Sequence, residues 1–152
     1  MGRARRVVHQ APFGGGRLVA ANSAWARAAH PAVRDEWRAA LLGGQILTTP
    51  VVMLEVLLSA RDGAGFDEVE SALRALDVLP LTPETGELAI RGQRELAHVH
   101  PLYHRSAKIP DLLLAAAAQL AGAGVLHYDE DLDRIASVLE IESRWIAPRG
   151  AL

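Results

Sequence analysis

The run of residues 112–118 constrains the fold of this chain more than any other, because it consists only of leucine and alanine. Pro110 before it is favourable in the first turn of a helix, and Gly122 after it is a stop signal. We therefore predict a helix over residues 110–121. A helix that is apolar nearly all round has to be covered on more than one face, so we expect this helix to be buried.

Short apolar runs alternate with segments of helical spacing along the chain. The runs that we predict as strands are 17–20, 45–48, 78–81, 125–127 and 144–146. The predicted helices begin near Trp25, after a cap at Asn22 and Ser23, and then cover 31–42, 50–60, 66–76, 82–99, 110–121 and 131–139, with 100–109 as a loop. This alternation is typical of a parallel sheet that helices cover on both faces. We predict an α/β fold with three α/β/α layers and a short-stranded, mainly parallel sheet.

The composition narrows the classes of function. Of 152 residues, 50% are hydrophobic and 22% are charged, which is typical of one globular domain. The 16 Lys and Arg residues nearly balance the 18 Asp and Glu residues, so binding of a nucleic acid requires a local basic patch. The absence of cysteine excludes a disulfide framework, thiolate catalysis and a cysteine zinc site. It permits the reducing cytoplasm, where we expect the protein.

We expect one folded domain over residues 17–147 and a tail at 148–152. Residues 1–16 are expected to be a flexible leader or a remnant of cloning, because the basic start is followed by Pro12 and a triple glycine instead of a long apolar segment. No apolar run reaches the length of a membrane span, so we expect no membrane partner. No GxGxxG, Walker A or GxSxG motif supports nucleotide binding or serine hydrolysis.

Acidic residues stand at two places where a parallel sheet gathers its functional groups. Asp111 stands at the start of the apolar helix. A second group follows the strand predicted at 125–127 and consists of Asp129, Glu130, Asp131 and Asp133. Each has an ordinary explanation, because Asp111 can stabilise the helix dipole by about 0.3–1 kcal/mol and the acidic run can be a solvated turn. Sites in such folds, however, lie beyond the carboxyl ends of strands, where gathered carboxylates are typical of a divalent metal.

Glu55 is the third acidic candidate, because it lies within the apolar segment predicted as the helix 50–60. A lone acid there is costly to bury unless it is paired or metal-bound, but it can also lie on a solvated stripe, and both interpretations stay open. Three positively charged or titratable residues, His104, Arg105 and Lys108, stand in the predicted loop just before Asp111, and Arg61 stands near Glu55. They are either surface charges or contacts to a phosphate beside a metal. The six histidines show no metal-binding spacing and are expected to be structural or solvent-exposed.

Together these residues resemble the PIN-domain family, in particular the ribonuclease toxins of the VapC type from bacterial toxin–antitoxin pairs. The family pattern has a first-strand aspartate followed by x-Ser/Thr, then a helical glutamate, a Pro-Asp-like helix start, and a strand that ends in an Asp-x-Asp turn. Glu55 matches the second element, residues 108–115 match the third, and residues 127–136 match the fourth. The resemblance covers residues 17–147, nearly the whole ordered chain.

The first element departs from this pattern. Residues 18–25 are similar to the family's Leu-Val-Ala-Asp-Thr-Ser-Ala-Trp, with Ser23 in register as a supporting residue. Ala21, however, stands where the family has its metal-binding aspartate, and Asn22 stands in place of the threonine. Asn22 is one position off and would point to the opposite face of a strand. The resemblance therefore implies a metal site that lacks one carboxylate, through a natural departure or a deliberate substitution.

The resemblance implies a small α/β/α endoribonuclease that depends on Mg²⁺ (or Mn²⁺) and hydrolyses RNA phosphodiester bonds. The catalytic and metal-binding residues that it implies are Asp111, Glu55, Asp129 and Asp131, around position 21. Arg105 and Lys108 would bind the backbone of the RNA, which could be tRNA, rRNA or mRNA. A cognate antitoxin of the VapB type would neutralise the toxin, and the helices 50–60 and 66–76 are candidate surfaces for the antitoxin and for a homodimer. With Ala21, we expect impaired activity.

Two other classes of function stay open. A non-catalytic PIN-like module that sequesters antitoxin or RNA without cutting it is favoured by Ala21. A receiver-like phosphoacceptor domain requires paired acids after its first strand and a lone aspartate after a central strand, and the acids of this chain do not follow that order. An aspartate codon at position 21 of the encoding gene would favour the nuclease over the binding module.

Overall fold

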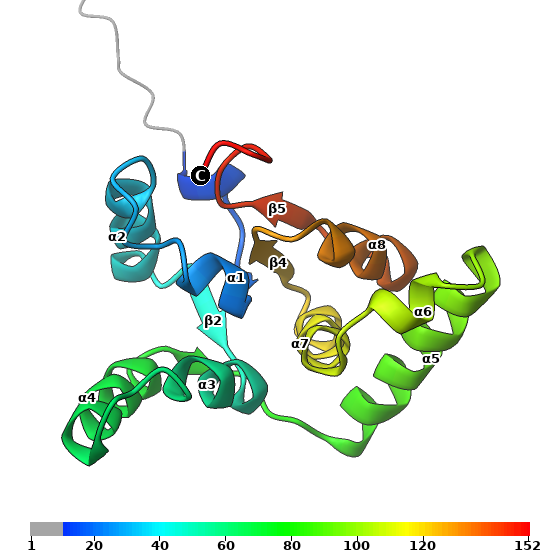
Figure 1. Cartoon of the computed structure of the whole chain (residues 1–152), viewed down its shortest axis with the longest axis horizontal. Helices are drawn as coiled ribbons and strands as arrows, with labels where there is room; N and C mark the ends of the chain where they lie inside the picture. Colours follow the sequence, from blue (N-terminus) through cyan, green and yellow to red (C-terminus); the bar gives the residue numbers. More distant parts are fainter. Residues whose placement is uncertain (1–10) are drawn as a thin grey trace, which may run out of the picture.

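The computed structural model describes residues 11–152 and contains a five-stranded sheet in the order β3-β2-β1-β4-β5 (Figure 1). The strands are β1 (Leu18–Ala20), β2 (Ile46–Thr48), β3 (Asp77–Val78), β4 (Gly124–His127) and β5 (Ser143–Trp145). Every neighbouring pair is parallel. Strand β1 is central, and its last residue, Ala20, is in register with Leu126 of β4. The predicted short-stranded parallel sheet is confirmed.

Helices cover both faces of this sheet. They are η1 (Pro12–Gly14), α1 (Asn22–Trp25), α2 (Arg34–Leu42), α3 (Pro50–Leu57), α4 (Gly63–Arg74), α5 (Pro83–Val99), α6 (Tyr103–Ser106), α7 (Ile109–Leu120) and α8 (Glu130–Leu139). Val19 and Val125 belong to the core that α5, α7 and α8 cover. Leu18 and Leu126 belong to the core on the other face, beneath α2 (Figure 1). Because adjacent strand residues alternate between two cores, the predicted three layers are confirmed.

Helix α7 is the innermost helix of the domain. It packs against β1 and β4 of the sheet and against α3, α5 and α8. Leu114, Ala115, Ala116 and Ala118 are all 0% exposed, as the apolar run predicts. Alanine has a short side chain, so the neighbouring elements approach the helix closely on several sides. This packing fixes the position of the first turn of α7, which carries Asp111.

Some boundaries differ from those predicted. Strand β3 ends at Val78 instead of 81, because Pro80 has no N–H to donate to the sheet. The predicted loop 100–109 contains the short helix α6. The predicted cap of α1 by Asn22 and Ser23 is wrong, because Ala21 is the N-cap residue and no side chain of the described residues caps this helix. The hydroxyl of Ser23 instead accepts a hydrogen bond from a distant backbone N–H, as described below.

The beginning and the end of the described chain both pack on the domain. Phe13 in η1 is buried, and its N–H donates a hydrogen bond to Glu36 of α2 (2.7 Å). The expected leader, 1–16, therefore includes a packed segment, while its residues 1–10 lie outside the described part. In the expected tail, the N–H of Leu152 donates to the hydroxyl of Tyr128 (2.9 Å). No helix within residues 11–152 is long and apolar enough to cross a membrane.

Gly124 at the start of β4 offers a test of the sheet packing. A Cβ atom at this position would lie 2.9 Å from the carbonyl oxygen of Glu142 and 3.1 Å from a methyl of Leu18. Because backbone atoms cannot move aside cheaply, Gly124→Ala should destabilise the fold by about 1–3 kcal/mol, as overpacking does. Gly86→Ala in α5 is the control, since its Cβ meets nothing within 4 Å. The control should stabilise the fold by about 0.5–1 kcal/mol in urea unfolding. A Gly124→Ala variant as stable as the parent would contradict this packing.

Candidate functional site

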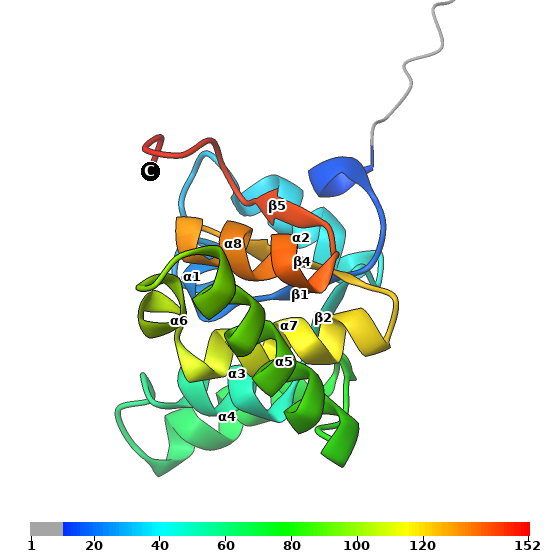
Figure 2. The ribbon, with the colours of Figure 1, turned by 90° about the vertical axis from the view of Figure 1, so that its right-hand side faces the viewer.

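The candidate site lies where β1 and β4 end and α7 begins. Ala21 directly follows β1, and its N–H donates to the carbonyl oxygen of Leu126 in β4 (2.9 Å). Asp129 follows β4, and Asp111 lies in the first turn of α7. Figure 2 shows α1, the start of α7 and the start of α8 at the same end of the domain. The acidic positions thus gather at the carboxyl edge of the sheet, where parallel α/β folds place their sites.

Asp111 is buried at the start of α7, with only 7% of its surface exposed. Burial is the largest cause that raises the pKa of its carboxyl group to about 7, and the negative charge of Glu55 is the second. Asp129 and Asp131 also raise this pKa, whereas the positive charge of Lys108 lowers it. The carboxyl group of Asp111 is therefore close to half protonated at neutral pH, in surroundings that would favour a cation.

Glu55 on α3 is half-buried, and its Oε1 atom has no hydrogen-bond partner among the described residues. Burial raises the pKa of Glu55, and the charge of Lys108 opposes this effect. The charge of Glu55 in turn raises the pKa of Asp111, so the two carboxyl groups are neighbours. Of the two interpretations that the sequence leaves open, the structure favours the one in which Glu55 faces the other acids.

Asp129 and Asp131 lie at the start of α8, and each faces a cation of the chain itself. Asp129 caps this helix, because its Oδ1 accepts the N–H of Asp131 (3.0 Å). The other carboxylate oxygen of Asp129 lies 3.5 Å from the Nζ of Lys108. Asp131 accepts a hydrogen bond from the guanidinium of Arg134 (2.8 Å). The neighbouring Glu130 pairs with Arg134 and Arg149 instead of joining the other acids.

Ala21 occupies the position where the resemblance places a metal-binding aspartate. Its side chain is 1% exposed and lies in the same core as α7, on the side of the sheet that carries Asp111. Asn22, the next residue, is exposed and supplies no oxygen to this core. Ser23 joins α1 to residues 128–131, which follow β4 and are called the acidic loop below, because its Oγ accepts the N–H of Tyr128 (3.0 Å). Position 21 therefore presents a methyl group to this core, where the resemblance implies a carboxylate.

The basic residues predicted to bind RNA lie beside this cluster. Lys108 immediately precedes α7, and 65% of its side chain is exposed although it faces Asp129. Arg105 is exposed on α6 and forms no ion pair within the described residues. His104 on the same short helix is half-buried, with an Nδ1 atom that lacks a partner in that part of the chain. Two cationic side chains thus reach solvent on the α6–α7 side of the acids.

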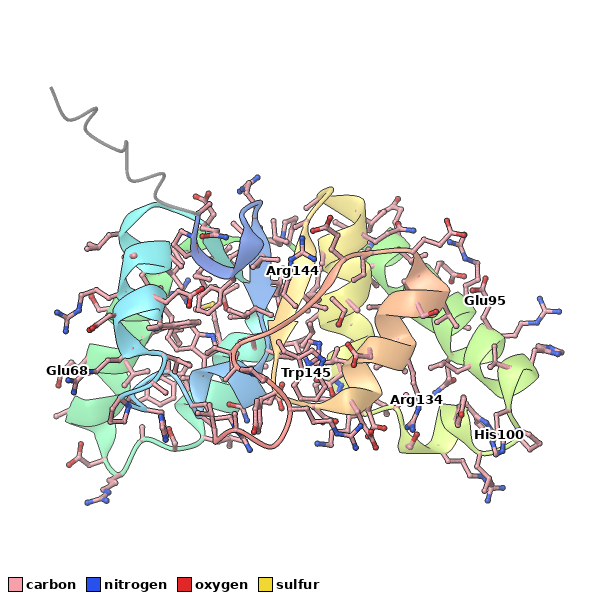
Figure 3. The ribbon with its side chains drawn as sticks, turned by 90° about the horizontal axis from the view of Figure 1, so that it is seen from above. Glu68, Glu95, His100, Arg134, Arg144 and Trp145 are labelled. Atoms are coloured by element: carbon pink, nitrogen blue, oxygen red, sulfur yellow. The ribbon has the colours of Figure 1, made fainter. Side chains whose placement is uncertain are left out.

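Sequence analysis does not identify two residues that hold the acids in place. Arg134, which is labelled in Figure 3, lies three positions after Asp131 on α8, a spacing that predicts a pair. Its guanidinium also lies 4.7 Å above the ring of Tyr103. His127 is 0% exposed, and its Nδ1 accepts the N–H of Asp129 (3.1 Å). Burial lowers the pKa of His127, which keeps the ring neutral. The sequence signal for this role of His127 is its position as a polar residue at the end of an apolar strand.

The donor atoms at this edge of the sheet are oxygens, the type that Mg²⁺ prefers, and they are few. Among residues 11–152, no three acidic or histidine side chains are arranged so that they could hold a metal ion. Mg²⁺, however, is often held by one or two carboxylates and keeps several waters. Asp111 and Glu55 offer only oxygen, and the Oε1 atom of Glu55 has no hydrogen-bond partner within residues 11–152. A fuller cage would require Asp129 and Asp131, which face cations of the chain, and a carboxylate at position 21.

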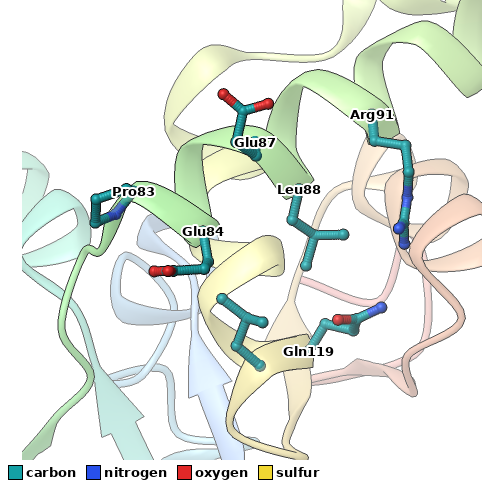
Figure 4. Close-up of a pocket in the computed structure, with 7 residues that line it drawn as sticks. Pro83, Glu84, Glu87, Leu88, Arg91 and Gln119 are labelled. Carbon is teal, nitrogen blue, oxygen red and sulfur yellow. The ribbon is translucent and has the colours of Figure 1, made fainter.

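A groove at the other end of α7 does not belong to this cluster. It has a volume of about 660 Å³ and lies between the start of α5 and the end of α7. Figure 4 shows Glu84 and Leu88 of α5 on one side of it and Gln119 of α7 on the other. The lining mixes acidic, basic and apolar groups and therefore indicates no particular ligand.

Comparison with known proteins adds to this geometry. A model of the PIN domain matches residues 22–138. Ribonuclease VapC18 of Mycobacterium tuberculosis is 47% identical over 130 residues, which cover 86% of this chain and 95% of that protein. Ribonuclease VapC51 of the same organism is 38% identical over 126 residues, 83% of this chain and 90% of that protein.

Solved structures show the same fold at low sequence identity. VapBC-5, a toxin–antitoxin system from Mycobacterium tuberculosis, matches with a TM-score of 0.57 and 20% identity over 85% of this chain and 98% of that chain. VapBC2 from Rickettsia felis, bound to a DNA fragment from its promoter, matches with a TM-score of 0.55 and 16% identity. This match covers 84% of this chain and 98% of that chain. A likeness at this level of identity supports the fold alone.

The raised pKa of Asp111 predicts how stability depends on pH. The folded state holds the proton of Asp111 up to about pH 7, whereas the unfolded state releases it near its ordinary value of 3.8. The stability that protonation provides is therefore complete at low pH and is lost as the pH rises through about 7. At about pH 8, Asp111→Asn should unfold at a higher urea concentration than the parent. Its free energy of unfolding should exceed that of the parent by up to roughly 4 kcal/mol.

The advantage of Asp111→Asn should shrink steadily as the pH falls towards about 4. Urea unfolding at a series of pH values measures this difference in the absence of divalent ions. Asp67→Asn, at an exposed position on α4, is the control for the loss of one carboxyl group. A difference between Asp111→Asn and the parent that stays constant over this range would show that Asp111 is not held protonated.

Proposed function

We propose a function from the premise that this chain belongs to the PIN-domain family, in which it is a ribonuclease toxin of the VapC type from a toxin–antitoxin system. The proposed activity is hydrolysis of RNA phosphodiester bonds by a cytoplasmic endoribonuclease that uses Mg²⁺ (or Mn²⁺). A cognate antitoxin of the VapB type would neutralise it. The observation that carries the proposal is the pair Asp111 and Glu55, whose pKa values are both raised by burial at the carboxyl edge of the sheet.

Asp111 and Glu55 would be the principal ligands of the ion. Asp129 and Asp131, whose charges act on Asp111, would orient its waters. A bound Mg²⁺ supplies a water of lowered pKa and neutralises charge on the scissile phosphate. Asp129 is held for this task by its capping of α8, and Asp131 is held by Arg134. In the absence of a cation, Asp111 limits the repulsion within the cluster by holding a proton.

Lys108 and Arg105 are proposed to bind the phosphate backbone of the RNA. Both side chains belong to the segment that leads into α7, so a strand bound along it would pass over the acids. The ion pair of Lys108 with Asp129 spans 3.5 Å and is exposed to solvent, which makes it weak. A phosphate can therefore displace Asp129 as the partner of Lys108 at small cost.

Ala21 is proposed to impair this activity in the chain as it stands. A carboxylate at this corner would bring a further charge to the ion from the end of the central strand, and a methyl group brings none. The metal is then held by fewer charged ligands and binds more weakly. Ala21→Asp should restore binding of Mg²⁺ or Mn²⁺, with a gain in affinity of at least about tenfold, and with it cleavage of RNA.

The control variant for Ala21→Asp is Asn22→Asp, which adds the same charge one residue further at an exposed position. It should leave metal affinity and cleavage close to those of the parent. Without a divalent ion Ala21→Asp should lower the melting temperature, because it buries a fourth acid near Asp111, and Mn²⁺ should reverse this loss. The nuclease proposal fails if Ala21→Asp cleaves neither structured nor unstructured RNA with Mg²⁺ or Mn²⁺.

A second candidate function is a binding module that sequesters antitoxin or RNA without cutting it. Ala21 favours it, because the fold and the basic side chains do not depend on the missing carboxylate. RNA binding by this chain at an affinity that Ala21→Asp does not change, without cleavage by either protein, would favour the module over the nuclease.

The helices α3 and α4 present an apolar surface that we propose as the contact for the antitoxin and for a second copy of the chain. Leu54 and Leu58 at the end of α3 are 66% and 85% exposed, and Phe66 on α4 is 39% exposed. Helices α3 and α4 contact each other, so these three side chains belong to one helical pair. Their exposure is characteristic of a contact surface that excludes water when a partner binds.

Replacing Leu54 and Leu58 by serine should abolish dimerisation of the isolated chain. Both side chains are mostly exposed, so the double variant should unfold at nearly the same urea concentration as the parent. Leu42→Ser is the matched control, because Leu42 is 83% exposed on α2, away from this surface. Light scattering after size exclusion measures the mass. A monomeric parent, or a double variant that remains dimeric, would contradict the dimer at this surface.

A further inference from the structure

His127 is a fully buried polar residue at the last position of β4, and both of its ring nitrogens are engaged. It is 0% exposed. Its Nδ1 accepts the backbone N–H of Asp129 (3.1 Å), and its Nε2 lies 2.6 Å from the Oγ of Ser143 in β5. The ring therefore connects the residue that carries a carboxylate of the candidate site with the edge strand of the sheet.

The hydrogen bonds around His127 are consistent with a single arrangement of protons. Because Nδ1 accepts an N–H, the proton of the neutral ring has to be on Nε2, which then donates to Ser143. The hydroxyl of Ser143 donates in turn to Asp133 of α8. The second carboxylate oxygen of Asp133 accepts the indole N–H of Trp145 (3.0 Å), whose ring lies 5.0 Å from that of His127. Asp133 and Trp145 thus fix the tautomer of the ring.

The acidic loop is held by side chains on two consecutive backbone N–H groups. The N–H of Tyr128 donates to Ser23 of α1, and the next N–H, that of Asp129, donates to His127. These two contacts turn the chain as it leaves β4, so that Asp129 becomes the N-cap of α8. Its side chain then faces Lys108 and lies close enough to Asp111 to raise the pKa of that residue.

We propose that His127 is a positioning residue for Asp129, and that its Nδ1 atom, as a fixed hydrogen-bond acceptor, sets the direction in which the carboxylate of Asp129 enters the candidate metal site. This inference rests on the proposed function in so far as Asp129 acts on a bound ion. A purely structural histidine would fasten β4 to β5 through Nε2 and Ser143. The acceptor bond from Nδ1 to the loop distinguishes the positioning role from that structural role.

Two substitutions test the roles of the two ring nitrogens separately. His127→Asn keeps an acceptor near the Nδ1 position, because an asparagine side chain readily accepts the N–H two residues further on, but it loses the contact with Ser143. His127→Gln places its amide near the Nε2 position and keeps a polar partner for Ser143, but it loses the acceptor for Asp129. Both variants are made in the Ala21→Asp background, with Mn²⁺ as the probe.

Three measurements are compared: exchange of the Asp129 amide proton by NMR, Mn²⁺ affinity by electron paramagnetic resonance, and unfolding in urea. We expect His127→Gln to speed exchange of the Asp129 amide and to weaken Mn²⁺ binding by about 10–100-fold, as loss of a residue that orients a ligand does. His127→Asn should keep both close to the parent even where it unfolds at a lower urea concentration. Equal losses in the two variants, or no loss in His127→Gln, would overturn the proposal.

Ser143→Ala keeps the test decisive where a substitution at position 127 prevents folding. Ser143 is only partly buried, and its removal leaves the ring without its partner at Nε2. We expect the nitrogen shifts of His127 to show a mixture of tautomers and Mn²⁺ affinity to fall together with them. An unchanged tautomer with reduced affinity would overturn the account. If Ala21→Asp binds no Mn²⁺ at all, the proposed function fails, and amide exchange at Asp129 alone still decides the role of His127.

Discussion

The burial of helix α7 on nearly all sides is the constraint from which the site follows. Its alanines let β1, β4 and three helices approach it closely, so that little freedom is left to its position. The first turn of the helix then lies at the carboxyl edge of the sheet, and Asp111 in this turn is buried at the edge of the core. A carboxyl group placed there has to share a proton, a cation of the chain or a metal.

The charges around Asp111 show how the fold tolerates this concentration of acids. Lys108 and Arg134 each form an ion pair with one carboxylate of the acidic loop. The charge of Lys108 also lowers the pKa of Glu55, but the Oε1 atom of Glu55 has no hydrogen-bond partner among the described residues. The need for a cation is therefore greatest between Asp111 and Glu55. In the proposed function, the methyl group of Ala21 adds no charge to this repulsion and offers no ligand to an ion.

The sequence predicts the layers, the parallel sheet and the grouping of the acids, because apolar periodicity and the order of elements determine them. The sequence also indicates which position matches the family's first aspartate, position 21, because the residues around it match the family segment in register. It does not predict the side chains that hold the acids, such as Arg134 and His127, because their role depends on rotamers and on contacts between distant segments. The sequence does not predict the contacts of Ser23 and Phe13 for the same reason. Ser23 bonds to Tyr128 and Phe13 bonds to Glu36, and both partners are distant in the sequence.

The ionisation of Asp111 tests the central claim most directly, and carbon NMR of its carboxyl group can follow it in the intact chain. The account predicts a pKa of about 7 in the absence of divalent ions. It also predicts that Mg²⁺ or Mn²⁺ lowers this pKa, because a cation stabilises the ionised form of the same carboxyl group. An ordinary acidic pKa that saturating Mg²⁺ does not change would contradict the claim that this buried cluster is built to hold a cation.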